Sequence, residues 1–205
     1  MRLLELFAGT GSVGKSFLKY KWKVVGLDLE KGHEIQCDIL TWDYKKYPVG
    51  YFDAIHASPP CIQYSIARTN AKTPRDFVSA DKLVRKTLEI IRYFHPSVWI
   101  IENPYTGYLR KRPCMKDMAR FLRVVCYCKY GKPYKKATAI WTNLGTYWEE
   151  RPMCNTETPC EFVRNGRHAK SAQYTSGYTT EDLNELPKAL CDDLAKATTQ
   201  ACKER

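Results

Sequence analysis

A cysteine that follows two prolines has the clearest capacity for covalent chemistry in this chain. Cys61 comes directly after Pro59 and Pro60, shortly beyond an apolar stretch at residues 52–56. Because prolines restrict the backbone, they present the thiol in a fixed place. About forty residues later, a second apolar stretch ends in Glu102. A thiolate is a nucleophile and a carboxyl group can hold a proton, so this pair could combine covalent catalysis with proton transfer.

A glycine-rich turn near the N-terminus could hold a second ligand. Residues 6–14 read LFAGTGSVG and lie between an expected strand and an expected helix. Glycines there allow a tight turn and a close approach of the backbone to a ligand. Asp28 ends the next expected strand, where it could accept hydrogen bonds from ribose hydroxyls, and Asp38 ends the third, where it could meet an adenine amine. NAD, FAD and S-adenosylmethionine enzymes all use turns of this kind.

The same turn satisfies a pattern that is typical of ATP-binding loops. Four residues separate Gly9 from Gly14, and Lys15 and Ser16 follow, as in G-x-x-x-x-G-K-S. The chain lacks an obvious apolar strand that ends in a magnesium-binding aspartate of the usual kind. ATP binding is therefore the weaker interpretation of the turn.

Alternating strands and helices must position these groups. Short apolar stretches predict strands, and apolar residues at helical spacing predict helices. The expected strands are residues 3–7, 23–27, 34–37, 52–56, 98–101, 123–129 and 138–142, and the expected helices are residues 13–20, 80–94, 115–122 and a last one from about Thr180 or Pro187 to Ala197. This alternation predicts an α/β fold with a mostly parallel sheet, which binds ligands at the carboxyl ends of its strands.

The composition fits one domain that acts on a polyanion. The chain has 205 residues, 44% of them hydrophobic, which suits a single domain over residues 1–205. The formal net charge is +11, and basic residues cluster at residues 19–23, 110–112 and 129–136. A basic surface favours nucleic acid through phosphate neutralisation, although any one cluster could equally be a solvated surface.

Neither secretion nor a membrane anchor is expected from the sequence. The longest apolar runs, such as residues 98–101, are far too short to cross a bilayer, and the first residues lack a signal-peptide pattern. We therefore expect a protein of the cytosol or the nucleus. The chain has nine cysteines, an odd number, so we expect reduced thiols rather than a disulfide framework.

The segment from about residue 149 to residue 178 has no clear strand or helix pattern, and it precedes the C-terminal helix. Three residues in it could bind a zinc ion: Cys154, Cys160 and His168. Such an ion would cross-link the segment, with either Cys191 or Cys114 as the fourth ligand. The spacing is not that of a standard C-x-x-C pair, so buried thiols and a surface histidine are the alternative interpretation.

Taken in order, these motifs resemble those of the cytosine-C5 DNA methyltransferase family. The ordered set is the FAGTG loop at residues 7–11, Asp28, Asp38, the PCIQYS segment at residues 60–65, and Glu102 with Asn103. The resemblance covers roughly residues 1–143 and is strongest to the short phage- and virus-type members. It implies a Rossmann-like methyltransferase fold, with a mostly parallel seven-stranded sheet that contains one antiparallel strand and has helices on both faces.

The resemblance also implies a reaction. A methyl group would pass from S-adenosylmethionine to C5 of cytosine in DNA, through an adduct of the Cys61 thiolate at C6, while Glu102 holds N3 of the base. Cofactor contacts are expected from Phe7, Ala8, Gly9, Thr10, Gly11, Asp28, Leu29, Asp38, Ile39 and Pro59. Substrate contacts are expected from Gln63, Ser65, Arg68, Asn103 and Lys136. The loop from Ser65 to Asp76 is expected to close over a base that has been flipped out of the duplex.

Three departures from the family pattern concern DNA and the cofactor. Lys136 and Thr138 stand where the family has arginines. Lys136 keeps the positive charge of an arginine but cannot donate two parallel hydrogen bonds to one partner. The long target-recognition region is missing, because only about forty irregular residues lie between Thr142 and the last helix. The Gly-Asn motif that normally completes the cofactor pocket is not found. We therefore expect little sequence discrimination, or specificity supplied by a homo-oligomer or a protein partner.

Two other functions stay open from the sequence. An RNA cytosine-C5 methyltransferase would carry the same catalytic pair. No motif in the sequence is known to recognise the 2′-hydroxyl that distinguishes RNA from DNA, so the sequence does not separate the two substrates. A catalytically weak regulatory subunit of the same fold would agree with Thr138 and with the missing recognition region. The presence of both Cys61 and Glu102 favours an enzyme.

Overall fold

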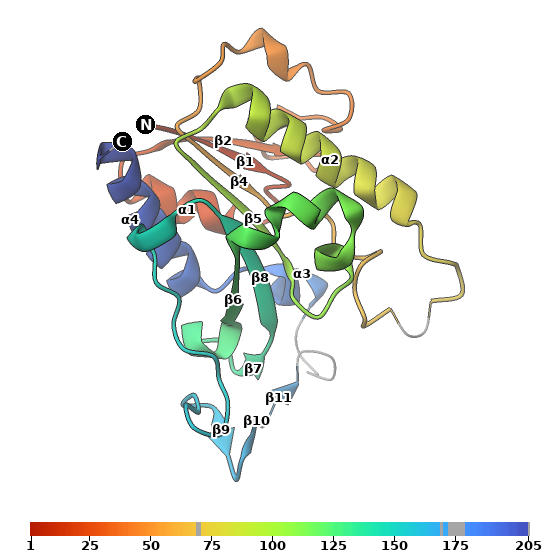
Figure 1. Ribbon diagram of the computed structural model, residues 1–205, viewed down its shortest axis with the longest axis vertical. Coiled ribbons are helices and arrows are strands. Elements are labelled where there is room, and N and C mark those ends of the chain that lie inside the picture. The colour runs from red at the N-terminus through yellow and green to blue at the C-terminus, as the bar shows by residue number, and fades with distance from the viewer. Residues whose placement is uncertain (69–70, 169, 172–178, 205) are drawn as a thin grey trace.

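A seven-stranded sheet forms the centre of the protein (Figure 1). The computed structural model describes residues 1–68, 71–168, 170–171 and 179–204. The strand order is β3-β2-β1-β4-β5-β8-β6. These strands are β1 (Arg2–Leu6), β2 (Lys23–Asp28), β3 (Ile35–Gln36), β4 (Ala54–Ala57), β5 (Val98–Pro104), β6 (Leu122–Cys126) and β8 (Ala137–Thr142).

One strand of the sheet runs against the others. Strands β1 to β5 pair in parallel, whereas β8 is antiparallel to both β5 and β6. The expected Rossmann-like α/β fold, with seven strands of which one is antiparallel, is therefore confirmed. Parallel strands place their carboxyl ends at one edge of the sheet, and this edge holds the candidate site.

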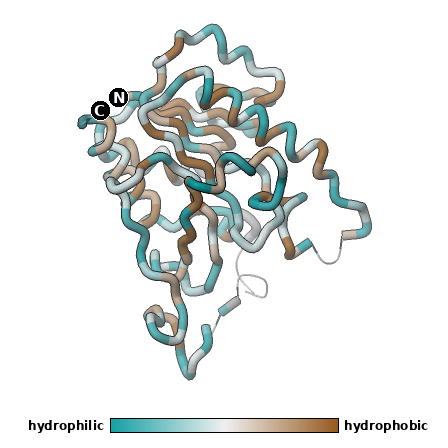
Figure 2. Tube along the Cα trace, in the orientation of Figure 1, coloured by the Kyte–Doolittle hydropathy of each residue, from teal (hydrophilic) through white to brown (hydrophobic). Residues whose placement is uncertain are grey.

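Alternating apolar side chains give the sheet a hydrophobic core on each face. Leu4 and Ile101 belong to one buried cluster, whereas their neighbours Leu3 and Ile100 belong to the other. The first cluster includes the apolar face of α2 (Phe77–Phe94), and the second includes α1 (Ser12–Leu18) and α4 (Lys188–Glu204). Figure 1 shows these helices on the two sides of the sheet, and Figure 2 shows the apolar residues gathered along the central strands.

The region after β5 differs from the expected helix and strand. Residues 115–122 were expected to form a regular helix, but a 3-10 helix, η3 (Pro113–Phe121), occupies this place. Met115 is the one fully buried side chain of η3, and Cys114, Met118 and Phe121 pack against the same core while partly exposed. The expected strand at 123–129 ends at Cys126, because the 3-10 turn η4 (Tyr127–Tyr130) follows and leads into Gly131 with a positive φ of 91°.

The C-terminal helix is longer than expected. A short helix, α3 (Thr180–Asn184), precedes it, and α4 runs on to Glu204 rather than ending at Ala197. The longer helix buries further residues on its inner face, including Ala201, against the core that α1 shares. The indole Nε1 of Trp22 donates a hydrogen bond to Thr199 Oγ1 at 2.8 Å and fixes this contact.

The segment expected to be irregular contains three very short strands. β9 (Val163–Arg164) and β10 (Arg167–His168) form an antiparallel hairpin, which Figure 1 shows at the end of the molecule away from the termini. β11 (Lys170–Ser171) pairs in parallel with β7 (Tyr134–Lys135). Residues 172–178 of the expected segment lie outside the described residues. No helix in the described ranges combines the length and the apolar character that crossing a bilayer requires.

Candidate active site

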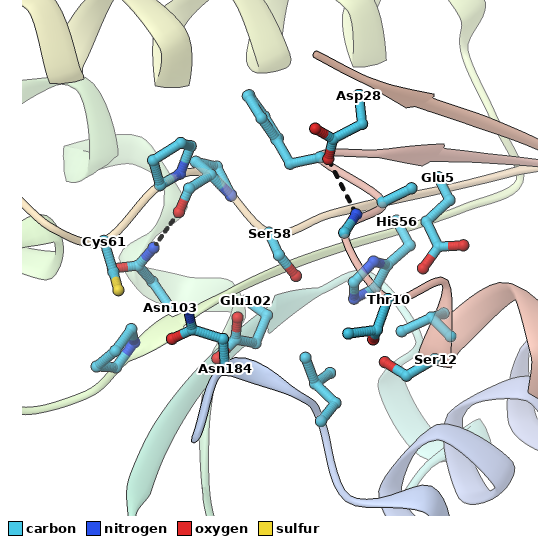
Figure 3. A pocket seen from close by; sticks show the side chains of 18 of the residues that line it. Glu5, Thr10, Ser12, Asp28, His56, Ser58, Cys61, Glu102, Asn103 and Asn184 are labelled. Atoms are coloured by element: carbon cyan, nitrogen blue, oxygen red, sulfur yellow. Dashed lines mark hydrogen bonds between the residues drawn. The ribbon is translucent and has the colours of Figure 1, made fainter. Parts of the chain in front are cut away.

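A cavity of about 540 Å³ opens at the carboxyl ends of β1, β2, β4 and β5 (Figure 3). Its size lies within the range of small-molecule sites in proteins. Ten of the residues expected to bind the cofactor or substrate, or to react, line it: Phe7, Ala8, Gly9, Thr10, Asp28, Pro59, Cys61, Glu102, Asn103 and Lys136. The structure therefore brings the thiol, the carboxylate and the glycine loop to one place.

The glycine loop is bent by a series of positive φ angles. Phe7, Gly9 and Gly11 have φ angles of 57°, 50° and 66°, which glycine adopts at no steric cost and other residues rarely adopt. The N–H of Gly9 donates to Asp28 Oδ2 at 2.9 Å, and the N–H of Glu30 donates to the other oxygen at 3.1 Å. The loop and the carboxylate at the end of β2 thus form one rigid wall of the cavity.

The residues that imitate an ATP-binding loop have other partners. Ser16 is buried, and its hydroxyl donates to Asp192 Oδ1 on α4 at 2.7 Å. The Nζ of Lys15 donates to the backbone oxygen of Thr10 at 2.9 Å. Because Ser16 holds α1 against α4, its hydroxyl is not directed toward a magnesium ion in the cavity. The contacts do not support the ATP-binding interpretation.

The loop that carries Cys61 is tied to β5. The side-chain Nδ2 of Asn103 donates to the backbone oxygen of Pro59 at 2.8 Å (Figure 3). The preceding residue, Glu102, is buried, and Tyr127 donates its hydroxyl to Glu102 Oε1 at 3.3 Å. These bonds fix the thiol and the carboxylate on neighbouring strands of the sheet.

Burial and charge act together on the catalytic pair. Burial raises the pKa of Cys61, the nearby Glu102 raises it further, and Lys136 lowers it. Burial also raises the pKa of Glu102, which Lys136 and the hydroxyls of Tyr127 and Ser58 partly offset. The two negative charges oppose each other, so a protonated Glu102 favours the Cys61 thiolate. A thiolate beside a protonated carboxyl would combine a nucleophile with a proton donor.

Three buried polar atoms of the cavity wall lack a partner among the described residues. They are Nδ1 and Nε2 of His56 and Oδ1 of Asn103. Buried polar atoms are nearly always hydrogen-bonded, so unpaired ones in a cavity indicate a polar ligand. Together with the loop N–H groups and the Asp28 carboxylate, they fit a cofactor such as S-adenosylmethionine, which has polar groups at both ends.

Sequence reasoning missed several residues of the cavity: Glu5, Ser12, Glu30, His56, Ser58, Asn184 and Leu186. The Gly-Asn motif is absent, as the sequence indicated, because Leu183 precedes Asn184, but Asn184 itself lines the cavity near the C-terminus. It is the last residue of α3, and it faces the cavity in Figure 3. No glycine precedes Asn184, so the Gly-Asn pattern could not have identified it. Its position three residues before Pro187, which precedes α4, was the one signal in the sequence.

Four of the expected cofactor residues lie outside the cavity lining: Gly11, Leu29, Asp38 and Ile39. The side chain of Ile39 is in the hydrophobic core, and that of Leu29 is 68% exposed. Asp38 Oδ1 accepts a hydrogen bond from the N–H of Leu40 at 2.9 Å, so this carboxylate caps its own turn. Their role in cofactor binding stays a prediction.

The expected substrate loop is held by contacts within itself. Gln63 Oε1 accepts from the N–H of Asp76 at 3.0 Å, and Ser65 Oγ accepts from the N–H of Ala67 at 3.1 Å. Arg68 donates to Thr73 Oγ1 at 2.6 Å, while residues 69–70 lie outside the described residues. Gln63, Ser65 and Arg68 do not line the cavity, so their contact with a base also stays a prediction.

The expected metal ligands come together, but with a different fourth member. Cys154, Cys160 and His168 form a cluster with Cys128. Neither Cys191 nor Cys114 belongs to it, since Cys191 lies on the buried face of α4 and Cys114 lies in η3, where it packs against the other core. The 3-10 turn after β6 places Cys128 there, where a continuous strand had been expected.

Glu5 gives the fold a pH dependence that can be measured. Burial raises its pKa from 4.5 to about 7, although the N–H of Gly14 donates to it and acts in the opposite direction. Since the pKa is higher in the folded state, the protonated form stabilises the fold. This contribution, about 3 kcal/mol, is complete below pH 4.5 and is lost as the pH rises through about 7.

Urea unfolding of the wild type and of Glu5→Gln tests this effect. Between about pH 5 and about pH 8, the wild type is expected to lose about 2–3 kcal/mol of stability relative to the variant. The buried His56, whose pKa is lowered to about 4, acts equally in both proteins and cancels in the difference. Parallel pH curves for the two proteins would show that Glu5 is ionised in the fold at neutral pH.

Solved structures with a similar fold are methyltransferases. A DNA modification methyltransferase encoded within a prophage of E. coli matches with a TM-score of 0.50 and 14% identity, over 69% of this chain and 46% of its own. The Entamoeba histolytica methyltransferase EhMeth matches with the same score and identity, over 75% of this chain and 56% of its own. The chain thus spans about half the length of these structures, and its fold is that of the methyltransferase class.

The family follows from the sequence comparisons. Residues 1–106 match the model of the family described as "C-5 cytosine-specific DNA methylase". A relative from Frog virus 3 (isolate Goorha), described as "Probable DNA (cytosine-5)-methyltransferase", is 35% identical over 157 residues, which are 70% of this chain and 71% of the relative. The chain belongs to the C-5 cytosine-specific DNA methylase family. It is a DNA cytosine-C5 methyltransferase, and membership implies S-adenosylmethionine as the methyl donor and DNA as the substrate.

Proposed function

We propose that the protein methylates cytosine through a covalent adduct of Cys61. The observation that carries this proposal is that Cys61 and Glu102 line one cavity with the glycine loop and Asp28. C5 of cytosine is a poor nucleophile, and addition of a thiolate to C6 gives it the electron density of an enamine. Covalent catalysis of this kind divides one difficult step into two easier ones.

The proton on Glu102 has a defined part in the first step. As the Cys61 thiolate forms a bond to C6, the Glu102 carboxyl donates its proton to N3 of the base and becomes negative. Burial raises the pKa of Glu102, which favours the protonated carboxyl that this step requires. After methylation, the C5 proton passes to a solvent water, expulsion of the Cys61 thiolate restores the C5–C6 double bond, and N3 returns its proton to Glu102.

The remaining cavity residues would hold the cofactor and orient the base. S-adenosylmethionine, when bound, supplies a methyl group on a sulfonium, which the nucleophilic C5 attacks. Gly9, Asp28 and Asn184 are the proposed cofactor contacts, with the loop residues Phe7, Ala8 and Thr10 and with Pro59. Asn103 has an unpaired Oδ1 that faces the same space, so we assign it to the base or to the cofactor beside it.

Lys136 is proposed to fix the electrostatics of the pair rather than to grip the base. Its Nζ donates to the backbone oxygen of Leu183 at 2.7 Å and lies 4.8 Å from the centre of the Tyr127 ring. It lowers the pKa of both Cys61 and Glu102. An arginine in this place could donate two parallel hydrogen bonds to one partner. The contact with α3 requires only the single hydrogen bond that Lys136 donates.

Specificity and place of action belong to the same proposal. We infer that residues 1–205 act as one domain, because a single sheet supports both cores. We further propose that a homo-oligomer or a protein partner supplies sequence specificity, since Thr138 is buried and the described residues between β8 and α3 form only short strands and turns. The cytosol and the nucleus are the proposed places of action, where DNA is present.

Methyl transfer to a panel of polymers tests the proposed function. Radiolabelled S-adenosylmethionine is incubated with the protein and duplex DNA, single-stranded DNA or RNA of matched sequence. We expect label on C5 of cytosine in DNA, with little dependence on the flanking sequence. Label in RNA alone would establish the RNA methyltransferase alternative, and cofactor binding without transfer to any polymer would establish the regulatory one.

A further inference from the structure

Outside the active site, three sulfur atoms and one imidazole ring converge beside the β9–β10 hairpin. They belong to Cys128, Cys154, Cys160 and His168, and one ligand atom of each lies within 4.8 Å of the others. Cys128 and Cys154 are buried, and the other two are partly buried. We propose that these four residues bind a structural zinc ion, which fastens the segment of residues 149–168 to the turn that follows β6.

The spacing of the four atoms is close to that of a tetrahedral zinc site. Zinc–sulfur bonds of about 2.3 Å and zinc–nitrogen bonds of about 2.0 Å put the ligand atoms about 3.5–3.8 Å apart. His168 Nε2 lies 3.7 Å from Cys154 Sγ and 3.1 Å from Cys160 Sγ. The largest separation in the set is no more than 4.8 Å, so side-chain rotations that draw the atoms closer would complete the tetrahedron.

Two of the ligands are brought together by a loop that needs no metal to form. Asn155 Oδ1 accepts hydrogen bonds from the N–H groups of Glu157 and Thr158, at 2.9 and 2.7 Å. Thr158 Oγ1 donates to the backbone oxygen of Met153 at 2.6 Å. This closed turn spans the five residues between Cys154 and Cys160, and it places both thiols on one side.

The hairpin positions the third ligand and the turn after β6 positions the fourth. Asn165 and Gly166 both have positive φ angles, of 51° and 75°, as in the two-residue turns that suit antiparallel hairpins. This turn sets His168 opposite Val163, whose N–H donates to the backbone oxygen of Cys160 at 3.2 Å. Cys128 reaches the same point from η4. Ligands from three separate local structures therefore meet with the geometry of a prepared site.

The surroundings favour a structural ion over a catalytic one. Three cysteines and one histidine fill all four positions of a tetrahedral site, which leaves none for water or substrate. Thiolate and imidazole ligands select zinc over magnesium or calcium. The apolar cluster around the site is small, consisting of Cys126, Cys128 and Cys154 with a few partly buried neighbours. A segment with strands of only two residues and so small a core needs another source of stability.

Metal content provides a direct test. The full chain, without a histidine tag, is purified in zinc-containing buffer and analysed by atomic emission. We expect about one zinc per chain, and near none in Cys154→Ser, Cys160→Ser and His168→Ala. Cys114→Ser is the remote control and Cys126→Ser the close one, because Cys126 Sγ is only 3.3 Å from Cys128 Sγ but lies outside the set of four. Both controls are expected to keep the ion.

Cobalt substitution keeps the test independent of variants that fold poorly. Wild-type protein reconstituted with Co²⁺ is expected to show strong visible ligand-field bands and a thiolate charge-transfer band, both typical of tetrahedral coordination. Protein that takes up neither zinc nor cobalt would overturn the proposal. So would full zinc content in Cys160→Ser, or a chain mass that shows the thiols joined as a disulfide. Loss of zinc in Cys126→Ser but not in an otherwise folded Cys128→Ser would overturn the assignment of Cys128.

Discussion

Replacement of Cys61 by alanine is expected to abolish methyl transfer to DNA while cofactor binding is retained. Without the thiol, no adduct forms at C6, and C5 keeps the low reactivity of free cytosine. Loss of a nucleophile from covalent catalysis costs on the order of 10⁴-fold or more in rate. Cofactor affinity, measured by calorimetry, should stay close to the wild-type value, because the glycine loop and Asp28 are held by bonds that do not involve Cys61.

A matched variant and a trapped intermediate sharpen this test. Cys114→Ala removes another partly buried thiol, which does not line the cavity, and should methylate DNA at the wild-type rate. DNA with fluorine in place of hydrogen at C5 lacks the proton that must leave, so the wild type should remain bound covalently and Cys61→Ala should not. A variant that still transfers methyl groups within tenfold of the wild type would rule out the covalent route.

Replacement of Glu102 by glutamine is expected to slow the reaction by about 10²–10⁴-fold, the usual contribution of general acid–base catalysis. Glutamine is nearly the same size and can still donate a hydrogen bond to N3, but it cannot transfer a proton. The loss should therefore appear in the single-turnover rate more than in DNA affinity. Because Glu102 is buried, with its pKa raised by burial, the effect should not depend on added salt.

Glu149→Gln is the control for this substitution. Glu149 is an exposed carboxylate away from the cavity, and its neutralisation should leave the rate unchanged. If Glu102→Gln reacts within threefold of the wild type, N3 is not protonated by this residue. Glu102→Gln that loses cofactor affinity along with activity would instead assign the residue to the cofactor.

The catalytic pair could be predicted because it depends on short-range features of a parallel sheet. Cys61 and Glu102 each follow an apolar strand, and adjacent parallel strands bring such residues to the same edge. The same reasoning located Gly9 and Asp28, whose hydrogen bond the structure shows. Strand ends and glycine turns are local signals, so spacing along the chain was sufficient to find them.

Two other residues could not be found in this way, because tertiary packing places them. Asn184 reaches the cavity from a five-residue helix, more than 170 residues after the glycine loop that it faces. Cys128 lies in what the apolar pattern 123–129 presented as a strand, and a 3-10 turn redirects its side chain. Neither turn nor short helix has a periodicity that the sequence could reveal.

The position of β8 between β5 and β6 has a consequence for the order of assembly. In the described sheet β6 pairs with β8 alone, although β6 comes first along the chain. Strand β6 therefore joins the sheet only through β8, either after that strand or together with it. The loop between β6 and β8 carries Cys128 and Lys136, so the proposed metal-binding turn and the lysine of the catalytic centre both depend on the pairing of these two strands.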